Sequence, residues 1–130
     1  MARILVCERV NLRRSGVHLE RTCDMLTRAQ HSIVECRDGL EVLSWLIDKA
    51  HPVDLVITGI FMPVMDGLEL IQSLRRRGLR MPILALYDHA SSLPAGLISS
   101  AASAFGATSV QPRPFAGAKL IEIVAGLLAG

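Results

Sequence analysis

The 130-residue chain has few aromatic residues, few cysteines and no long apolar run. Phe, Trp and Tyr make up only 4% of it, whereas 51% is hydrophobic, so aliphatic side chains must form the core. Three cysteines are an odd number, which does not suit a disulfide framework, and Cys7 and Cys36 fall inside apolar runs. We therefore expect reduced thiols in a cytoplasmic protein.

The chain also lacks an export signal and a membrane span. Its first apolar run is interrupted by charge at Glu8, too soon for a secretory segment. No other apolar run approaches the length that a bilayer requires. We expect a protein that is neither exported nor inserted in a membrane.

Charge is scarce in the C-terminal third. Residues 89–130 contain only Arg113, Lys119 and Glu122, whereas the other 23 of the 26 charged residues lie in the first 88 positions. The net charge of +2 is small, and nucleic-acid binders usually concentrate a basic excess. Arginines cluster in residues 75–80, but basic residues at a helix end complement the helix dipole. We expect no direct contact with nucleic acid.

No group of residues indicates a metal, a cofactor or an enzyme. The four histidines lie in different segments without the spacing of metal ligands. The chain has no nucleophile with a matching base and no glycine-rich phosphate loop. These absences predict a protein without catalytic activity.

Five short aliphatic runs, at residues 4–7, 32–36, 53–57, 83–86 and 107–110, are each followed by a stretch with helical spacing. The runs are continuously apolar, which is typical of parallel strands covered on both faces. The pattern predicts an α/β fold, a doubly wound five-stranded parallel sheet in a single domain over residues 1–130. Binding sites in such folds form beyond the carboxyl ends of the strands.

The helices can be placed from their caps and apolar stripes. Asp66 with Glu69 three residues later predicts a helix start, and that helix should end near Gly78. A second helix is expected over residues 40–49, with Trp45 as a packing residue. A fourth helix is expected between residues 91 and 105, and the last helix has its apolar stripe within residues 120–128.

The segment of residues 54–70 resembles the third strand, following loop and third helix of bacterial response-regulator receiver domains. The run from Met62 to Gly67, Met-Pro-Val-Met-Asp-Gly, is the specific part of the match. The resemblance continues at residues 82–86, 105–107 and 113–115 and covers essentially the whole chain. It implies the flavodoxin-like receiver architecture with strand order 2-1-3-4-5.

Receivers of this family transfer a phosphoryl group to an aspartate at the end of the third strand. Two acidic residues after the first strand hold magnesium, and a lysine after the fifth strand holds phosphoryl oxygens. At the matching positions this chain has Gly59 for the phosphoacceptor, Glu8 and Arg9 for the acidic pair, and Arg113 for the lysine. Glycine has no nucleophile, and a guanidinium stands where a divalent cation must bind. The resemblance therefore implies a degenerate receiver, a pseudo-receiver that binds little or no magnesium.

The conformational switch of the family is altered as well. Tyr87 stands where the family has a small hydroxyl residue, and Val110 where many members have the aromatic residue that rotates on activation. A bulky phenol cannot take the place of a small hydroxyl that slides toward the phosphoryl group. We expect that neither part of the switch works as it does in the family.

Four charged residues remain around the predicted pocket. We expect Glu8, Arg9, Asp88 and Arg113 to meet at the carboxyl ends of three adjacent strands and to form a salt-bridge network. The alternative is that Arg9, Arg113 and the space at Gly59 receive a small anion or an acidic side chain.

The uncharged C-terminal third suggests an interface. In receiver domains the fourth helix, fifth strand and fifth helix form a common surface for dimerisation and docking, and charge depletion is typical of interface cores. We expect Leu97 and Phe105 to lie on one side of the fourth helix, with Gly96 and small serines on the other. The candidate interface residues are Leu93, Leu97, Ser100, Ser103, Lys119 and Glu122.

Three functions remain open from the sequence. The first is a phosphorylation-independent interaction module, either a homodimer or an adaptor to a sensor kinase or another regulator. The second is a small-anion sensor that uses the pocket around Gly59, Arg9 and Arg113. The third is an active receiver that uses another carboxylate, Asp66 or Asp88, although Asp66 is better explained as a helix cap.

Overall fold

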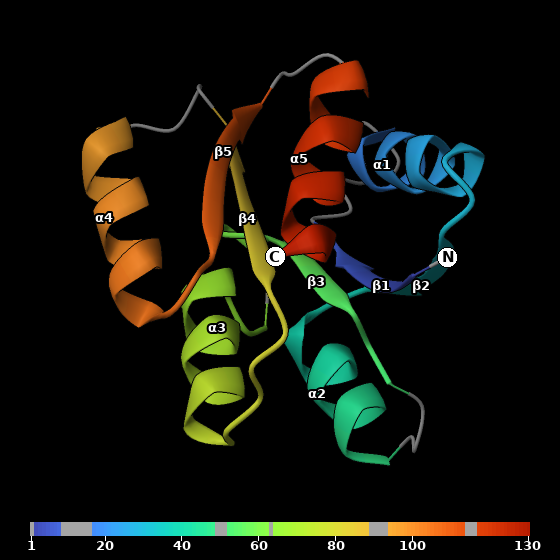
Figure 1. Cartoon of the computed structure of the whole chain (residues 1–130). Coiled ribbons are helices and arrows are strands. Elements are labelled where there is room, and N and C mark those ends of the chain that lie inside the picture. The colour runs from blue at the N-terminus through green and yellow to red at the C-terminus, as the bar shows by residue number, and fades with distance from the viewer. Residues whose placement is uncertain (1, 9–16, 49–51, 63, 89–93, 114–116) are drawn as a thin grey trace.

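A computed structural model describes residues 2–8, 17–48, 52–62, 64–88, 94–113 and 117–130. Strands and helices alternate along the whole chain (Figure 1). The elements are β1 (Arg3–Cys7), α1 (Val17–Arg28), β2 (Ser32–Cys36), α2 (Gly39–Asp48), β3 (Leu55–Gly59), α3 (Gly67–Arg76), β4 (Ile83–Asp88), α4 (Ala95–Phe105), β5 (Ser109–Arg113) and α5 (Gly117–Ala129).

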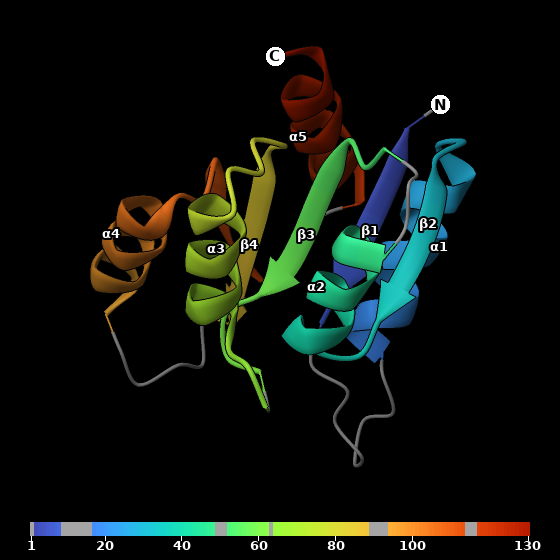
Figure 2. The same cartoon turned by 90° about the horizontal axis from the view of Figure 1, so that it is seen from below.

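The five strands form one parallel sheet in the order β2-β1-β3-β4-β5, which confirms the predicted fold class. β3 lies at the centre, with Ile57 in register with Val6 of β1 and Leu84 of β4. Helices α2, α3 and α4 cover one face, and α1 and α5 cover the other (Figures 1 and 2). The carboxyl ends of all strands therefore meet at one edge.

Two hydrophobic layers hold the sheet, one on each face. The layer under α2, α3 and α4 contains Val56, Leu70 and Ile71, and the layer under α1 and α5 contains Ile57 and Leu120. All five side chains are buried. Val56 and Ile57 enter different layers because successive residues of a strand point to opposite faces. Aliphatic residues fill both layers, as the low aromatic content predicted.

Two strands begin two residues later than their apolar runs. Before β3, Asp54 accepts a hydrogen bond from the Arg3 backbone N–H through Oδ2 at 2.9 Å, so it ties the strand start to β1. Before β5, Gly106 adopts φ 119° and the Ala107 N–H donates to the Ala102 carbonyl at 2.9 Å. Ala107 thus belongs to the turn that closes α4, whereas Val110 lies in β5.

The third helix begins as predicted, because the Asp66 side chain accepts the Glu69 backbone N–H at 2.9 Å. In α4 the apolar side chains are divided between the core and the surface. Ile98 and Ala102 are its buried residues, whereas Leu97 is 57% exposed and Phe105 is also exposed. The residues that anchor the helix, Ile98 and Ala102, lie on one face, and the larger apolar residues Leu97 and Phe105 remain on the surface.

Among the described helices, none is long and apolar enough to cross a membrane. All three cysteines are free and buried, in agreement with the predicted reduced thiols.

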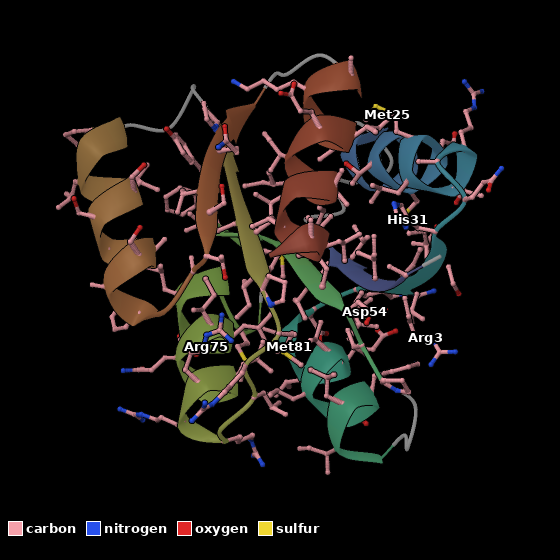
Figure 3. The ribbon with its side chains drawn as sticks, viewed as in Figure 1. Arg3, Met25, His31, Asp54, Arg75 and Met81 are labelled. Carbon is pink, nitrogen blue, oxygen red and sulfur yellow. The ribbon has the colours of Figure 1, made fainter. Side chains whose placement is uncertain are left out.

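Arg75 is a structural residue that the sequence did not single out. Its guanidinium extends from α3 (Figure 3) and donates to the carbonyls of Gly106 at 3.0 Å and of Leu79 and Met81 at 2.8 Å. These three carbonyls belong to the turn after α4 and to the turn before β4. Burial lowers the pKa of the Arg75 guanidinium from its ordinary value, and the charge-assisted hydrogen bonds offset that desolvation.

Replacing Arg75 should therefore cost stability, while its neighbour should not matter. We expect Arg75→Ala to lower the free energy of unfolding by about 2 kcal/mol, because three carbonyls lose a charged donor. The exposed Arg76→Ala is the matched control and should change it by less than about 0.5 kcal/mol. Urea unfolding of both variants measures the difference, and equal losses would contradict the structural role of Arg75.

Candidate functional site

The site predicted from the sequence lies at the carboxyl ends of the strands, where Gly59 ends the central strand β3. Gly59 is the last residue of β3, it is buried, and it pairs in register with Leu86 of β4. The Thr58 hydroxyl donates to the Gly59 carbonyl at 2.9 Å, and the Ile60 N–H donates to the Leu86 carbonyl at 3.0 Å. The backbone here is fixed by hydrogen bonds, but the position offers no side chain for chemistry.

The turn from β3 into α3 is closed by Gly67. Its N–H donates to the Ile60 carbonyl at 2.7 Å. A Cβ at Gly67 would overlap the Gly59 carbonyl oxygen and lie 2.8 Å from the Ile60 Cα. Only glycine allows the start of α3 to approach the end of β3 this closely.

Between these glycines the loop carries a strained residue. Val64 has φ 70° and is 74% exposed, and a β-branched side chain is disfavoured in this left-handed region. Phe61 is exposed in the same loop, whereas Met65 packs against Gly39 at the start of α2. Asp66 in this loop caps α3, as predicted. The strained backbone at Val64 was not predicted.

Of the four charged residues in the predicted network, Glu8 is the one whose side chain the structure describes. It is completely buried at the end of β1, and its Oε2 accepts a hydrogen bond from the Thr22 hydroxyl of α1 at 3.2 Å. A buried carboxylate needs such donors. Thr22 was missed by the sequence analysis, because a threonine inside a helix carries no distinguishing signal.

The predicted salt-bridge network stays a prediction. Arg9 and the side chains of Asp88 and Arg113 lie outside the described residues, as does Leu93. The backbones of Asp88 and Arg113 are register partners at the ends of β4 and β5. One part of the prediction was wrong, since the three strands concerned are not all adjacent: β3 lies between β1 and β4.

Tyr87 and Val110 lie in the same hydrophobic layer. Tyr87 is buried there together with Ile98 and Ala102 of α4, and Val110 is half-buried against the layer. Tyr87 pairs with Pro112 and Val110 with Ala85, on neighbouring strands. The chain thus places its aromatic side chain on β4, inside the core, and an aliphatic one on β5.

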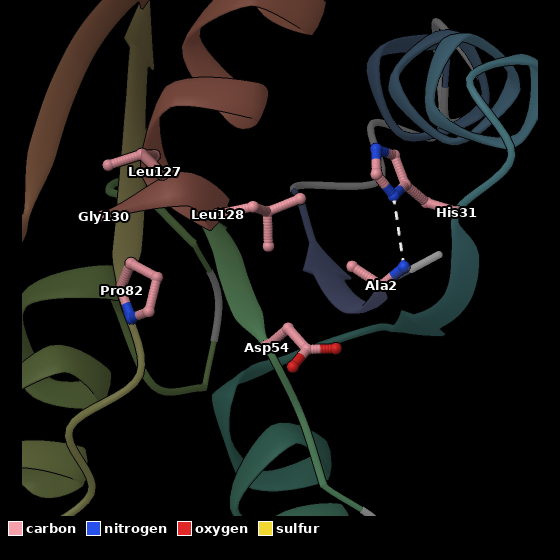
Figure 4. A pocket seen from close by; sticks show the side chains of 7 residues that line it. All are labelled: Ala2, His31, Asp54, Pro82, Leu127, Leu128 and Gly130. Atoms are coloured by element: carbon pink, nitrogen blue, oxygen red, sulfur yellow. Dashed lines mark hydrogen bonds between the residues drawn. The ribbon is translucent and has the colours of Figure 1, made fainter.

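A groove of about 370 Å³ lies at the opposite edge of the sheet (Figure 4). It is lined by Ala2, His31 and Asp54 from the strand starts and by Leu128 and Gly130 from the end of α5. His31 Nδ1 accepts the Ala2 N–H at 3.4 Å in this groove. The groove is separated from Gly59 by the length of β3, so it is not part of the candidate site.

Comparison with known proteins identifies the family of this chain. Residues 16–125 match the response regulator receiver domain. The chain belongs to this family. It is therefore a receiver domain of the two-component response-regulator type.

Two curated response regulators illustrate the relationship. MprA of Mycobacterium sp. (strain KMS) is 37% identical over 100 residues, which cover 75% of this chain and 40% of MprA. GtcR of Aneurinibacillus migulanus is 38% identical over 61 residues, which cover 47% of this chain and 24% of GtcR. The receiver chain thus spans less than half of the length of these relatives.

Solved receiver structures share the fold at low sequence identity. A response regulator from Chloroflexus aurantiacus J-10-fl has a TM-score of 0.83 and 21% identity, with 100% of both chains covered. Chemotaxis response regulator CheY4 of Vibrio cholerae has a TM-score of 0.80 and 24% identity, with 98% of both chains covered. These likenesses establish the receiver architecture and leave the chemistry to the residues of this chain.

The turn geometry predicts opposite effects of two alanine substitutions. Gly67→Ala should lower the free energy of unfolding by about 2–3 kcal/mol, because the new Cβ overlaps the backbone of Gly59 and Ile60. Gly126→Ala is the control, since a Cβ there meets nothing within 4 Å in the exposed part of α5. It should raise stability by about 0.5–1 kcal/mol through helix propensity. Equal signs in chemical denaturation would contradict the close approach.

Proposed function

We propose that this receiver domain acts without phosphorylation, as a pseudo-receiver that signals through protein contacts. The observation that carries the proposal is Gly59, which closes β3 at the position where the family has its phosphoacceptor aspartate. Acyl-phosphate formation needs a carboxylate nucleophile in line with the phosphoryl donor. Glycine at this position supplies none.

The acidic pair that holds magnesium in the family supports the same proposal. Its one retained carboxylate, Glu8, is buried and accepts a hydrogen bond from Thr22. The second acidic position is Arg9, a permanently charged cation that repels a divalent metal. A pocket with one carboxylate and one guanidinium has no excess negative charge to attract magnesium.

Tyr87 on β4 in place of a small hydroxyl residue, and Val110 on β5 in place of an aromatic one, support a fixed conformation of this part of the domain. Tyr87 is buried in the same hydrophobic layer as Ile98 and Ala102 of α4. Val110 has no ring that could alternate between an inward and an outward position. A receiver built in this way keeps one arrangement of α4 and β5, whatever happens at the strand edge.

The surface of α4, β5 and α5 is the proposed contact site for a partner protein. Leu97, Phe105 and Ile121 are exposed apolar residues on its two helices, and the only charged side chains described there are those of Lys119 and Glu122. Such a surface loses little hydration free energy when a partner covers it. Pro112 on the edge strand β5 lacks an N–H, so the partner binds through side chains and does not extend the sheet. The partner is a second copy of the chain, a sensor kinase or another regulator.

Phosphorylation can be tested directly by intact-protein mass spectrometry. With acetyl phosphate and Mg²⁺, the protein should gain no phosphoryl group, and Gly59→Asp alone should not gain one either, because Arg9 still occupies the metal position. Gly59→Asp combined with Arg9→Asp should gain one, and an active receiver domain serves as the positive control.

A phosphoryl group on the wild-type protein would contradict the proposal. Asp66→Asn and Asp88→Asn would then show which carboxylate accepts it. Since Asp66 caps α3 through the Glu69 N–H, its replacement also needs a check of folding by circular dichroism.

The contact surface predicts a second outcome, measured as molar mass against concentration by light scattering. We expect the protein to self-associate and Leu97→Lys to weaken the association roughly tenfold or more, because a charge would be buried in an apolar contact. Leu40→Lys on α2 is the matched control, since Leu40 is 52% exposed and Leu97 57%. A protein that stays monomeric at high concentration would exclude the homodimer and leave a heterologous partner.

A further inference from the structure

A cluster of three sulfur-bearing side chains, Cys7, Cys36 and Met62, lies next to the altered site in the layer beneath α2. Cys7 is the last residue of β1 and Cys36 the last residue of β2, and the two are register partners on neighbouring parallel strands. Met62 follows β3, and its Sδ lies 3.8 Å from the Cys7 Sγ. The sulfur-bearing side chains thus come from the last residues of β1 and β2 and from the loop after β3.

The two thiols point to the same face of the sheet. Cys7, Cys36 and Met62 belong to one hydrophobic layer, and both thiols are completely buried. Cys23 is also buried, but it lies in the other layer, beneath α1, together with Leu26. The cluster therefore contains two of the three cysteines, together with Met62. Cys23, in the other layer, serves as the control cysteine for substitutions.

From this geometry we propose that Cys7, Cys36 and Met62 form a binding site for a soft monovalent cation, Cu(I). Thiolate and thioether sulfurs are the ligands that select Cu(I) in proteins. Structural zinc sites require four nitrogen, oxygen or thiolate ligands, and among the described residues no group of three or more His, Cys, Asp or Glu is placed to supply them. Two thiolates and one thioether suit the softer ion.

The carboxylates of Asp38 and Glu41 lie close enough to the Cys36 thiol to act on it electrostatically. Burial, with smaller contributions from the carboxylates of Glu41 and Asp38, raises the pKa of the Cys36 thiol to about 12. Burial likewise raises the pKa of the Cys7 thiol, with smaller contributions from Cys36 and Asp38. Binding of one Cu(I) by both thiols releases two protons to solvent and leaves one net negative charge on the complex.

The cluster lies at the carboxyl ends of the strands. Cys7 and Cys36 are the terminal residues of their strands, and Met62 lies in the β3–α3 loop beside the exposed Phe61. Unlike the proposed loss of phosphorylation, this site uses no residue of the phosphoacceptor pocket. Either proposal can therefore fail without the other.

The test is transfer of Cu(I) to the reduced 130-residue chain from its complex with bicinchoninate, without oxygen. We expect one equivalent to transfer to the wild type and to Cys23→Ala. Cys7→Ala and Cys36→Ala should each weaken binding by at least about a hundredfold, because even loss of a residue that only orients a ligand costs ten- to a hundredfold. Met62→Leu, a volume-conserving change, should weaken it less but measurably.

Thermal unfolding gives an independent readout that also checks folding of the variants. One equivalent of Ag(I), a redox-stable analogue, should raise the unfolding temperature of the wild type and Cys23→Ala, and not that of Cys7→Ala or Cys36→Ala. The proposal is overturned if no Cu(I) transfers, if transfer is lost in Cys23→Ala, or if it is unchanged in Met62→Leu and both strand variants.

Discussion

The rest of the structure depends on the burial of β3 between two layers. Every residue of this central strand is buried, β1 and β4 pair with its two edges, and helices cover both of its faces. The strand must therefore end where α3 can return over the sheet, and Gly67 permits that return by its contact with the backbone of Gly59 and Ile60. The same contact that closes the fold fixes the backbone of the candidate site.

The fold was predictable because its signals are local and repeated. Five apolar runs with intervening helical spacing gave the correct class, and the resemblance of the Met62 to Gly67 segment gave the correct strand order. The starts of β3 and β5 were predicted two residues early, since apolar residues such as Val53 and Ala107 continue the pattern before the first strand pairing. Hydrogen bonds to distant backbone, which end a strand or a helix, leave no mark in composition.

The site was predictable only in its positions. Gly59 and Tyr87 lie where the resemblance placed them, at the ends of β3 and β4. The partner of Glu8 could not be anticipated, because Thr22 comes from a helix that packs on β1 only after folding. The exposure of Leu97 agrees with its place among the interface candidates, since Ile98 and Ala102 are the residues of α4 that are buried. Which of two apolar stripes is buried is decided by the shape of the layer below.

The central claim is that this receiver does not respond to phosphorylation. Its most direct test is the amide NMR spectrum of the wild-type protein, recorded before and after addition of Mg²⁺ with beryllofluoride, a stable phosphoryl mimic. A protein without a phosphoacceptor should show no shifts at Glu8, Gly59 or Tyr87 and none in α4 or β5. Saturable shifts that begin at the strand edge and extend to α4 and β5 would contradict the account.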